Sequence, residues 1–194
     1  MAEIIRDNTI VVDVCETYKK QTCRNHCTIY GPNGKQTLSI PVLRADGKRT
    51  LTRDIRISCH QSWQKNHWRS IETAYNNSPY FLYYQDTFAP FYKNKYTYLI
   101  DFNAELLLRV LKLLKIERPL VFSDDFIRDD FLHHREMLVS KKTIFDNPFY
   151  LQPFSSKSGF IPNLSIIDCL FNLGPETSGY LQGLGSFFFN SNVK

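Results

Sequence analysis

The sequence predicts an α/β protein of the mixed α+β kind, in which a small mixed sheet with a β-hairpin packs against several helices. Three observations favour this class. The β-branched run over 9–15, TIVVDVC, is typical of a buried strand. Asn33-Gly34 lies between two further strand-like runs and indicates a hairpin. Apolar residues then recur at helical spacing through the middle of the chain.

The strands that follow the first one are short. We expect the hairpin strands at 27–30 and 36–42, with Asn33-Gly34 supplying the positive φ angles of the turn. Residues 54–58 (DIRIS) alternate apolar and polar side chains, which predicts another strand, and 120–122 predicts one more.

Two helices are expected in the centre of the chain. A helix over 60–76 would place Trp63, His67 and Ile71 on one face. Ser78-Pro79 combines an N-cap side chain with a proline suited to a first turn, so the next helix should begin there and stop before Pro90.

Two more helices are expected later. Asn103 is predicted to cap a leucine-rich helix, with Phe102 and Leu107 packing across its first turn. Residues 163–173 predict a short helix closed by Gly174-Pro175. Residues 183–194 would form a C-terminal tail whose three phenylalanines need a surface to pack against.

Bulk composition predicts one domain over 1–194, since 43% of residues are apolar and 22% are charged. An apolar run of about 20 residues, as a membrane span needs, is absent from the sequence. The N-terminus lacks the order of a signal peptide, and five cysteines do not suggest a disulfide framework. We therefore expect a cytoplasmic protein with reduced thiols.

Charge is distributed unevenly. Between Thr17 and Arg69, eleven Lys and Arg oppose only Asp46 and Asp54, a net charge of +9 within a chain of +5. Such a block attracts anions, whether phosphate, carboxylate, nucleic acid or an acidic protein. The alternative is an ordinary solvated surface of loops and hairpin.

Several segments partly resemble phosphate-binding or metal-binding motifs, but none of them specifies such a site. The segment 31–35 (GPNGK) lacks phosphate-loop spacing and lies between strands. Cys23, His26 and Cys27, with Cys59 or His60, have poor spacing for zinc. The acidic pairs Asp124-Asp125 and Asp129-Asp130 are typical of an exposed face as well as of a magnesium site. We predict no bound metal and no cofactor.

A basic loop after the first strand is the leading candidate for substrate binding. Tyr18, Lys20, Arg24 and Asn25 leave the end of a buried strand, where α/β proteins gather ligands. Arginine, lysine and asparagine side chains suit a phosphate or carboxylate. On this hypothesis Arg24→Ala would abolish ligand binding without unfolding the domain. An ordinary surface loop is the alternative.

Two further groups are candidates. His67 lies one helical turn from Trp63 and would titrate near neutral pH, as a general acid or base does, with Trp68 beside the substrate. The alternative is a partly buried histidine with a satisfied hydrogen bond. Asp168 and Asn172 continue a polar stripe from Ser165 that either lines the same cleft or faces water.

Several segments follow one another in an informative order. They are Tyr18–Asn25, Asn33-Gly34, Leu38–Val42, Asp54–Ser58, His67-Trp68, Ala74-Tyr75, Pro79–Tyr84, Asp101–Asn103 and Pro162–Asn172. Taken together, these segments resemble the WbqC-like family, particularly its Bacteroidetes branch. The resemblance implies a role in surface-polysaccharide or O-antigen biosynthesis, through group transfer onto or from an anionic sugar-nucleotide or acyl-type substrate. The main alternative is a non-catalytic basic module that binds nucleic acid or an acidic protein.

The chain departs from that family in two places. Relatives usually have an earlier strand and a Pro- and aromatic-containing segment ahead of Ile4-Ile5, so we expect a missing N-terminal element. Cys23 stands where relatives tend to have an aromatic residue, and His26 where they often have Arg. The second difference weakens the expected basic clamp.

Overall fold

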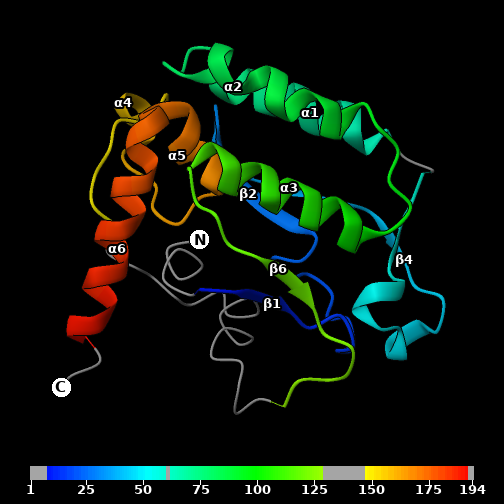
Figure 1. Ribbon diagram of the computed structural model, residues 1–194. Coiled ribbons are helices and arrows are strands. Elements are labelled where there is room, and N and C mark those ends of the chain that lie inside the picture. The colour runs from blue at the N-terminus through cyan, green and yellow to red at the C-terminus, as the bar shows by residue number, and fades with distance from the viewer. Residues whose placement is uncertain (1–7, 60–61, 129–146, 192–194) are drawn as a thin grey trace.

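The computed structural model describes residues 8–59, 62–128 and 147–191, and it confirms a mixed α/β fold (Figure 1). Helices pack against small sheets of two strands each. His60, Asp129, Asp130 and the N-terminal residues through Asp7 lie outside the described residues, as do the side chains of 187–189. The predictions made for those positions are therefore untested.

Strand β1 (Ile10–Val12) pairs in parallel with β6 (Leu120–Phe122). This pair lies on one side of α3, and α1 and α2 lie on the other side (Figure 1). The strand predicted over 9–15 is thus shorter than expected. The Asp13 carboxylate accepts the backbone N–H groups of Cys15 and Glu16, which turns the chain out of the β1–β6 pair. The chain then runs beside 50–53, where the Tyr18 N–H donates to the Thr50 carbonyl.

The predicted hairpin is confirmed. Strands β2 (His26–Gly31) and β3 (Gly34–Ser39) pair antiparallel from His26 opposite Ser39 to Gly31 opposite Gly34. Gly34 has a positive φ of 100°. Asn33, which was also expected to have a positive φ, does not. Strands β4 (Val42–Leu43) and β5 (Arg56–Ile57) form a second antiparallel pair, and β5 is shorter than expected because 52–54 form a 3-10 turn.

Helix α1 (Trp63–Tyr75) buries Trp63, His67 and Ile71, as its spacing predicts. Helix α2 (Phe81–Phe88) ends before Pro90 but begins three residues later than Ser78. The prediction failed there because the Tyr80 N–H donates to the Phe171 carbonyl, a tertiary contact. The Ser78 hydroxyl is not an N-cap, and it has no hydrogen-bond partner among the described residues.

Helix α3 (Leu99–Leu113) begins four residues before Asn103, so the predicted cap is wrong. The Leu99 N–H donates to the Ile55 carbonyl, and Leu99 and Phe102 are buried, which holds the extra turn in place. The Asn103 side chain is directed elsewhere: its Nδ2 donates to the Arg24 carbonyl at 2.8 Å.

The C-terminal part is helical. Helix α4 (Ser155–Ser158) is a single turn, and α5 (Ile166–Leu173) ends at Gly174, which has a φ of 57°. After a 3-10 turn, α6 (Thr177–Ser191) continues through 183, so the tail expected from 183 begins inside a helix. In the described parts of the chain, every helix is too short or too polar to cross a bilayer.

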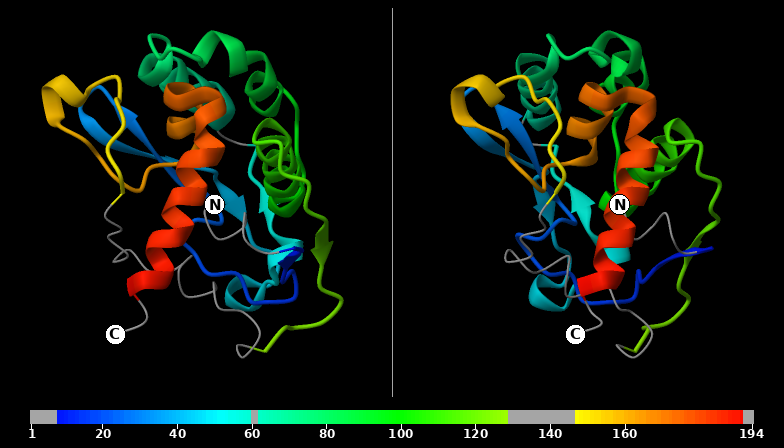
Figure 2. Two further views of the ribbon diagram at one scale, coloured as in Figure 1. Left: turned by 60° about the vertical axis from the view of Figure 1, so that its left-hand side comes forward. Right: turned by 90° about the vertical axis from the view of Figure 1, so that its left-hand side faces the viewer.

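Two apolar clusters hold these elements together. The first joins the hairpin to α1, α2, α5 and α6 through residues such as Ile29, Tyr75 and Phe171. The second joins β5, the start of α1 and the start of α3, and it includes Tyr18 and Trp63. The segment 147–161, with α4, lies against the hairpin (Figure 2), where the Tyr30 hydroxyl donates to the Gly159 carbonyl.

Gly174 provides a test of the α5–α6 corner. A Cβ at this position would lie 2.5 Å from the Tyr80 ring, and the φ of 57° is unfavourable for an L side chain. We expect Gly174→Ala to lower the free energy of unfolding by at least about 2 kcal/mol in urea denaturation. Gly179→Ala is the control, because an added Cβ there meets nothing within 4 Å. It should raise the free energy of unfolding by about 0.5–1 kcal/mol, and equal effects would contradict the expectation.

Candidate functional site

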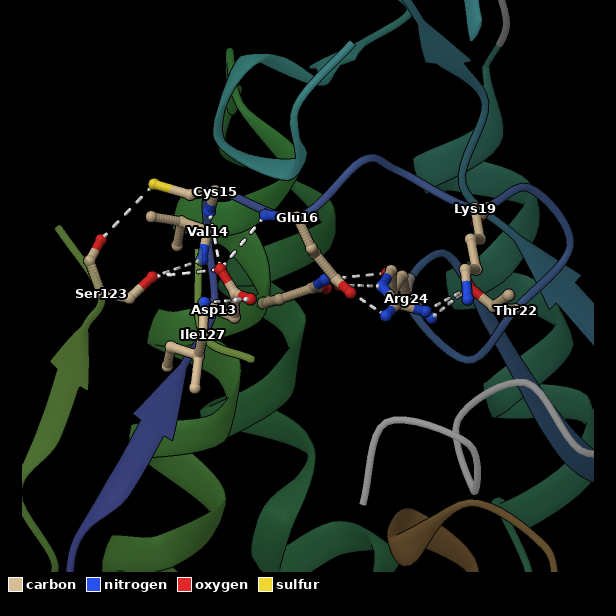
Figure 3. Close-up of polar contacts among 10 residues, drawn as sticks. Asp13, Val14, Cys15, Glu16, Lys19, Thr22, Arg24, Ser123 and Ile127 are labelled. Atoms are coloured by element: carbon tan, nitrogen blue, oxygen red, sulfur yellow. Dashed lines mark hydrogen bonds and ion pairs between the residues drawn. The ribbon is translucent and has the colours of Figure 1, made fainter. Parts of the chain in front are cut away.

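The carboxylate of Asp13 organises the carboxyl end of β1. Its Oδ1 accepts from the backbone N of Cys15 at 3.0 Å, the backbone N of Glu16 at 3.1 Å and the Ser123 hydroxyl at 3.1 Å. Its Oδ2 accepts from the backbone N of Ile127 at 3.2 Å (Figure 3). Asp13 therefore fastens the end of β1 to the segment that follows β6.

A buried ion pair lies next to it. The Arg24 guanidinium contacts Glu16 Oε1 through Nε at 2.7 Å and through Nη2 at 2.5 Å. The two side chains are 8% and 9% exposed, and Arg24 Nη1 also donates to the Thr22 hydroxyl at 3.3 Å (Figure 3). The positive charge of Arg24 is thus already balanced inside the protein. We call Asp13, Glu16, Arg24 and Ser123 the polar hub.

The polar hub anchors the loop formed by residues 17–25. Asn25 Nδ2 donates to the Ile40 carbonyl at 3.0 Å, and Asn103 holds the Arg24 carbonyl from α3. Tyr18, Arg24 and Asn25, three of the predicted substrate-binding residues, are buried in this arrangement. Lys20, the fourth, is exposed together with Lys19.

Tyr18 lies in the second apolar cluster and is 3% exposed. Burial raises the pKa of its phenol, and the positive charges of Arg44 and Arg24 partly oppose that rise. The Arg44 guanidinium lies over the Tyr18 ring, 5.9 Å from its centroid. The structure thus brings Arg44, which the sequence did not single out, to the predicted loop.

His67 is buried in α1. Its Nε2 lies 3.1 Å from the Ser39 carbonyl oxygen, and its ring packs edge-on against Trp63 at a centroid distance of 5.1 Å. Burial lowers the pKa of His67, an effect that the Ser39 contact partly opposes. Trp68 is half-buried and stacks on Phe81. The acid–base role of His67 stays a prediction.

Asp168 belongs to a separate buried network. It is 0% exposed, and it accepts hydrogen bonds from the Tyr75 hydroxyl at 2.8 Å, the Tyr150 hydroxyl at 2.6 Å and Gln152 Nε2 at 2.9 Å. Burial raises the pKa of Asp168, and these donors oppose the rise. Asn172 Nδ2 donates to the backbone carbonyl of Asp168. The Asp168 carboxylate thus faces neither water nor, among the described contacts, the loop of 17–25.

Sequence reasoning missed Asp13, Glu16 and Ser123. Asp13 carried a weak signal, since it is an acid at the end of a β-branched strand. Glu16 and Arg24 are eight residues apart in irregular chain, and that spacing predicts no contact.

The described residues include no group of three or more His, Cys, Asp or Glu side chains arranged to hold a metal ion. Cys27, one of the considered zinc ligands, is half-buried, and burial raises the pKa of its thiol to about 11.

Comparison with known proteins gives a broad match. The model of the WbqC-like protein family matches residues 3–158. A protein of Mycobacterium tuberculosis (strain H37Rv), whose name is "Uncharacterized protein Rv1507c", is 27% identical over 205 residues. That alignment covers 91% of this chain and 88% of the mycobacterial protein. No solved structure matches significantly. The family match includes the polar hub and His67, but not Asp168 or Asn172.

Because Arg24 forms a buried ion pair, we expect Arg24→Ala to change the stability of the protein. Removing the guanidinium leaves the Glu16 carboxylate buried without that counter-charge, so we expect the free energy of unfolding to fall by about 3–5 kcal/mol. Arg53→Ala is the control, because Arg53 and Asp54 are about half exposed and 3.9 Å apart. Its effect should stay below about 1 kcal/mol. Urea denaturation measures both, and similar losses for the two variants would contradict the structural role of Arg24.

His67 should titrate below the ordinary imidazole pKa of 6.5 because its charged form is poorly solvated. A folded-state pKa below the unfolded one means that stability is lost as pH falls through 6.5 toward the folded pKa. NMR titration of the imidazole protons measures the pKa, and the signal missing from His67→Gln identifies the residue. A midpoint at or above 6.5 would show that the ring is more solvated than its burial indicates.

Proposed function

The chain belongs to the WbqC-like protein family, and on that premise we propose that it is a transferase of surface-polysaccharide or O-antigen biosynthesis. Its substrate would be an anionic sugar-nucleotide or an acyl-type compound. Membership of this family supports the proposed pathway, and the geometry at the end of β1 supports the anionic character of the ligand.

One observation carries the proposal. A loop with two exposed lysines, Lys19 and Lys20, leaves the carboxyl end of a parallel strand pair, and buried polar contacts hold it there. Ligands of α/β proteins collect at such strand ends. Because Glu16 neutralises Arg24, the exposed lysines are the loop's cations that remain available to an anion.

The segment that pairs with this loop adds more positive charge. Thr52 N donates to the Glu16 carbonyl, and Thr17 lies opposite Leu51, so 50–54 runs beside the loop. Basic side chains on and next to that segment increase the local concentration of anions. They are Arg44, Arg49, Arg53 and Arg56.

Roles within the proposal follow from burial. Lys20 binds the anion and Tyr18 also contacts the ligand. Arg24 and Asn25 hold the loop in position. His67 is the candidate acid or base and would act through Nδ1, because Nε2 faces the Ser39 carbonyl. Trp68, Asp168 and Asn172 support the surrounding packing.

The same basic surface favours a second candidate function, in which the chain binds nucleic acid or an acidic protein without catalysis. Phosphate-backbone contacts release counterions, so affinity for nucleic acid falls steeply with salt. A gel shift with single-stranded RNA and duplex DNA, at low and moderate salt, tests this alternative. Retardation that disappears at moderate salt supports it, and no retardation at low salt excludes it.

Isothermal titration calorimetry against a panel of nucleotide sugars and acyl-nucleotides tests the proposed function. We expect at least one compound to bind, and Lys20→Ala to weaken its affinity about tenfold or more through loss of a charge-assisted contact. Lys112→Ala is the matched control. Lys112 is an exposed lysine of α3, about 13 Å along that helix from Asn103.

Two outcomes would contradict the proposal. One is a panel in which no nucleotide sugar or acyl-nucleotide binds the parent protein. The other is equal loss of affinity in Lys20→Ala and Lys112→Ala, which would indicate general electrostatic attraction.

A further inference from the structure

Three buried polar atoms near the polar hub have no hydrogen-bond partner among the described residues. They are the Tyr18 hydroxyl, Asn25 Oδ1 and the Thr52 hydroxyl, on side chains whose residues are 3%, 9% and 8% exposed. Folded proteins leave few such atoms unsatisfied, because each loses its hydrogen bonds to water. Three of them on two neighbouring segments are candidate groups for binding a ligand.

The three groups share one neighbourhood. The Tyr18 ring packs in the same apolar cluster as Ile40, and the carbonyl of Ile40 holds the amide of Asn25. Thr52 lies across from Glu16 and Tyr18 across from Thr50, since the backbone N of Thr52 donates to the Glu16 carbonyl and that of Tyr18 to the Thr50 carbonyl. Thr52 and Tyr18 are therefore diagonal neighbours on two paired segments. These contacts fix the segments and leave the side-chain oxygens unused.

Positive charge borders this neighbourhood. Arg44 lies over the Tyr18 ring, and its Nη1 donates to the Gly47 carbonyl at 3.2 Å. A guanidinium has five N–H donors, so others remain for an anionic oxygen. Arg24, by contrast, is occupied by Glu16 and Thr22.

The unused groups distinguish between ligand chemistries. The Tyr18 and Thr52 hydroxyls can donate or accept, whereas Asn25 Oδ1 can only accept. A fully ionised phosphate offers acceptors alone and would leave Asn25 unsatisfied. A sugar hydroxyl can accept from Tyr18 and donate to Asn25 at the same time.

We propose that Tyr18 and Asn25 bind a hydroxyl of a sugar ring and that Arg44, rather than Arg24, binds the phosphate attached to that sugar. This inference rests on the proposed function and narrows its substrate class to phosphorylated sugars. It also adds Arg44 to the binding residues and assigns Arg24 the separate task of positioning the loop.

Tyr18→Phe is the decisive variant. If the Tyr18 hydroxyl has no hydrogen-bond partner until a ligand binds, its removal leaves the melting temperature of the ligand-free protein unchanged or raises it. The reason is that the variant no longer buries an unsatisfied hydroxyl. The same variant should bind a hexose 1-phosphate about tenfold more weakly while its affinity for inorganic phosphate stays the same. A hydroxyl with only a structural role would instead lower the melting temperature of the free protein.

Arg44→Gln tests the charged half of the site. Titration calorimetry with a series of hexose 1-phosphates and with inorganic phosphate should show about tenfold weaker binding of both. Arg109→Gln, which removes an exposed guanidinium from α3, is the matched control and should bind like the parent.

The outcomes separate this inference from the broader function. Binding of nucleotide sugars that neither Tyr18→Phe nor Arg44→Gln weakens would overturn the inference and leave the proposed function in place. A parent protein that binds no phosphorylated sugar, no nucleotide sugar and no acyl-nucleotide overturns both. A lower melting temperature of ligand-free Tyr18→Phe also overturns the inference, because the hydroxyl is then satisfied in the free protein.

Discussion

The buried pair of Glu16 and Arg24 constrains much of the structure around it. Two charges removed from water are stable only when they face each other and their remaining hydrogen-bonding groups are satisfied. Arg24 meets this requirement through Glu16 and Thr22, while Asn103 secures its backbone from α3. The backbone of the loop between the two charges is therefore anchored next to β1, and Lys19 and Lys20 are exposed on it.

Three buried acids in this chain are stabilised by different donors. Asp13 receives backbone N–H groups and a serine hydroxyl, Glu16 receives a guanidinium, and Asp168 receives two phenols and an amide. Asp13 and Asp168 join segments that are distant in sequence, whereas Glu16 closes a loop of eight residues onto Arg24. Asp13 joins β1 to the chain after β6, and Asp168 joins α5 to α1 and to 150–152. The buried carboxylates thus hold separate segments of the chain together by hydrogen bonds and an ion pair.

This arrangement separates binding from positioning. Arg24 and Arg44 have different surroundings. Glu16 neutralises Arg24 inside the protein, whereas Arg44 lies over the Tyr18 ring and has further N–H groups that can donate to a ligand. In the proposed site, a buried arginine would fix the backbone that carries the binding groups, and a partly exposed one would contact the ligand. The proposed site therefore depends on both, although only the second would contact the substrate.

The sequence by itself determined the fold class, the hairpin about Asn33-Gly34, the amphipathic face of α1 and membership of the family, because these depend on local periodicity, turn chemistry or motif order. Only the tertiary structure decided the parallel pairing of β1 with β6, the starts of α2 and α3, and the neutralisation of Arg24 by Glu16. Those features depend on partners far along the chain, such as Phe171 for Tyr80 and Ile55 for Leu99. Lys20 was predicted to be a binding group, and it is exposed as that role needs. Arg24 was predicted to be one too, but it is buried with Glu16, eight residues away in irregular chain, at a spacing that no local pattern encodes.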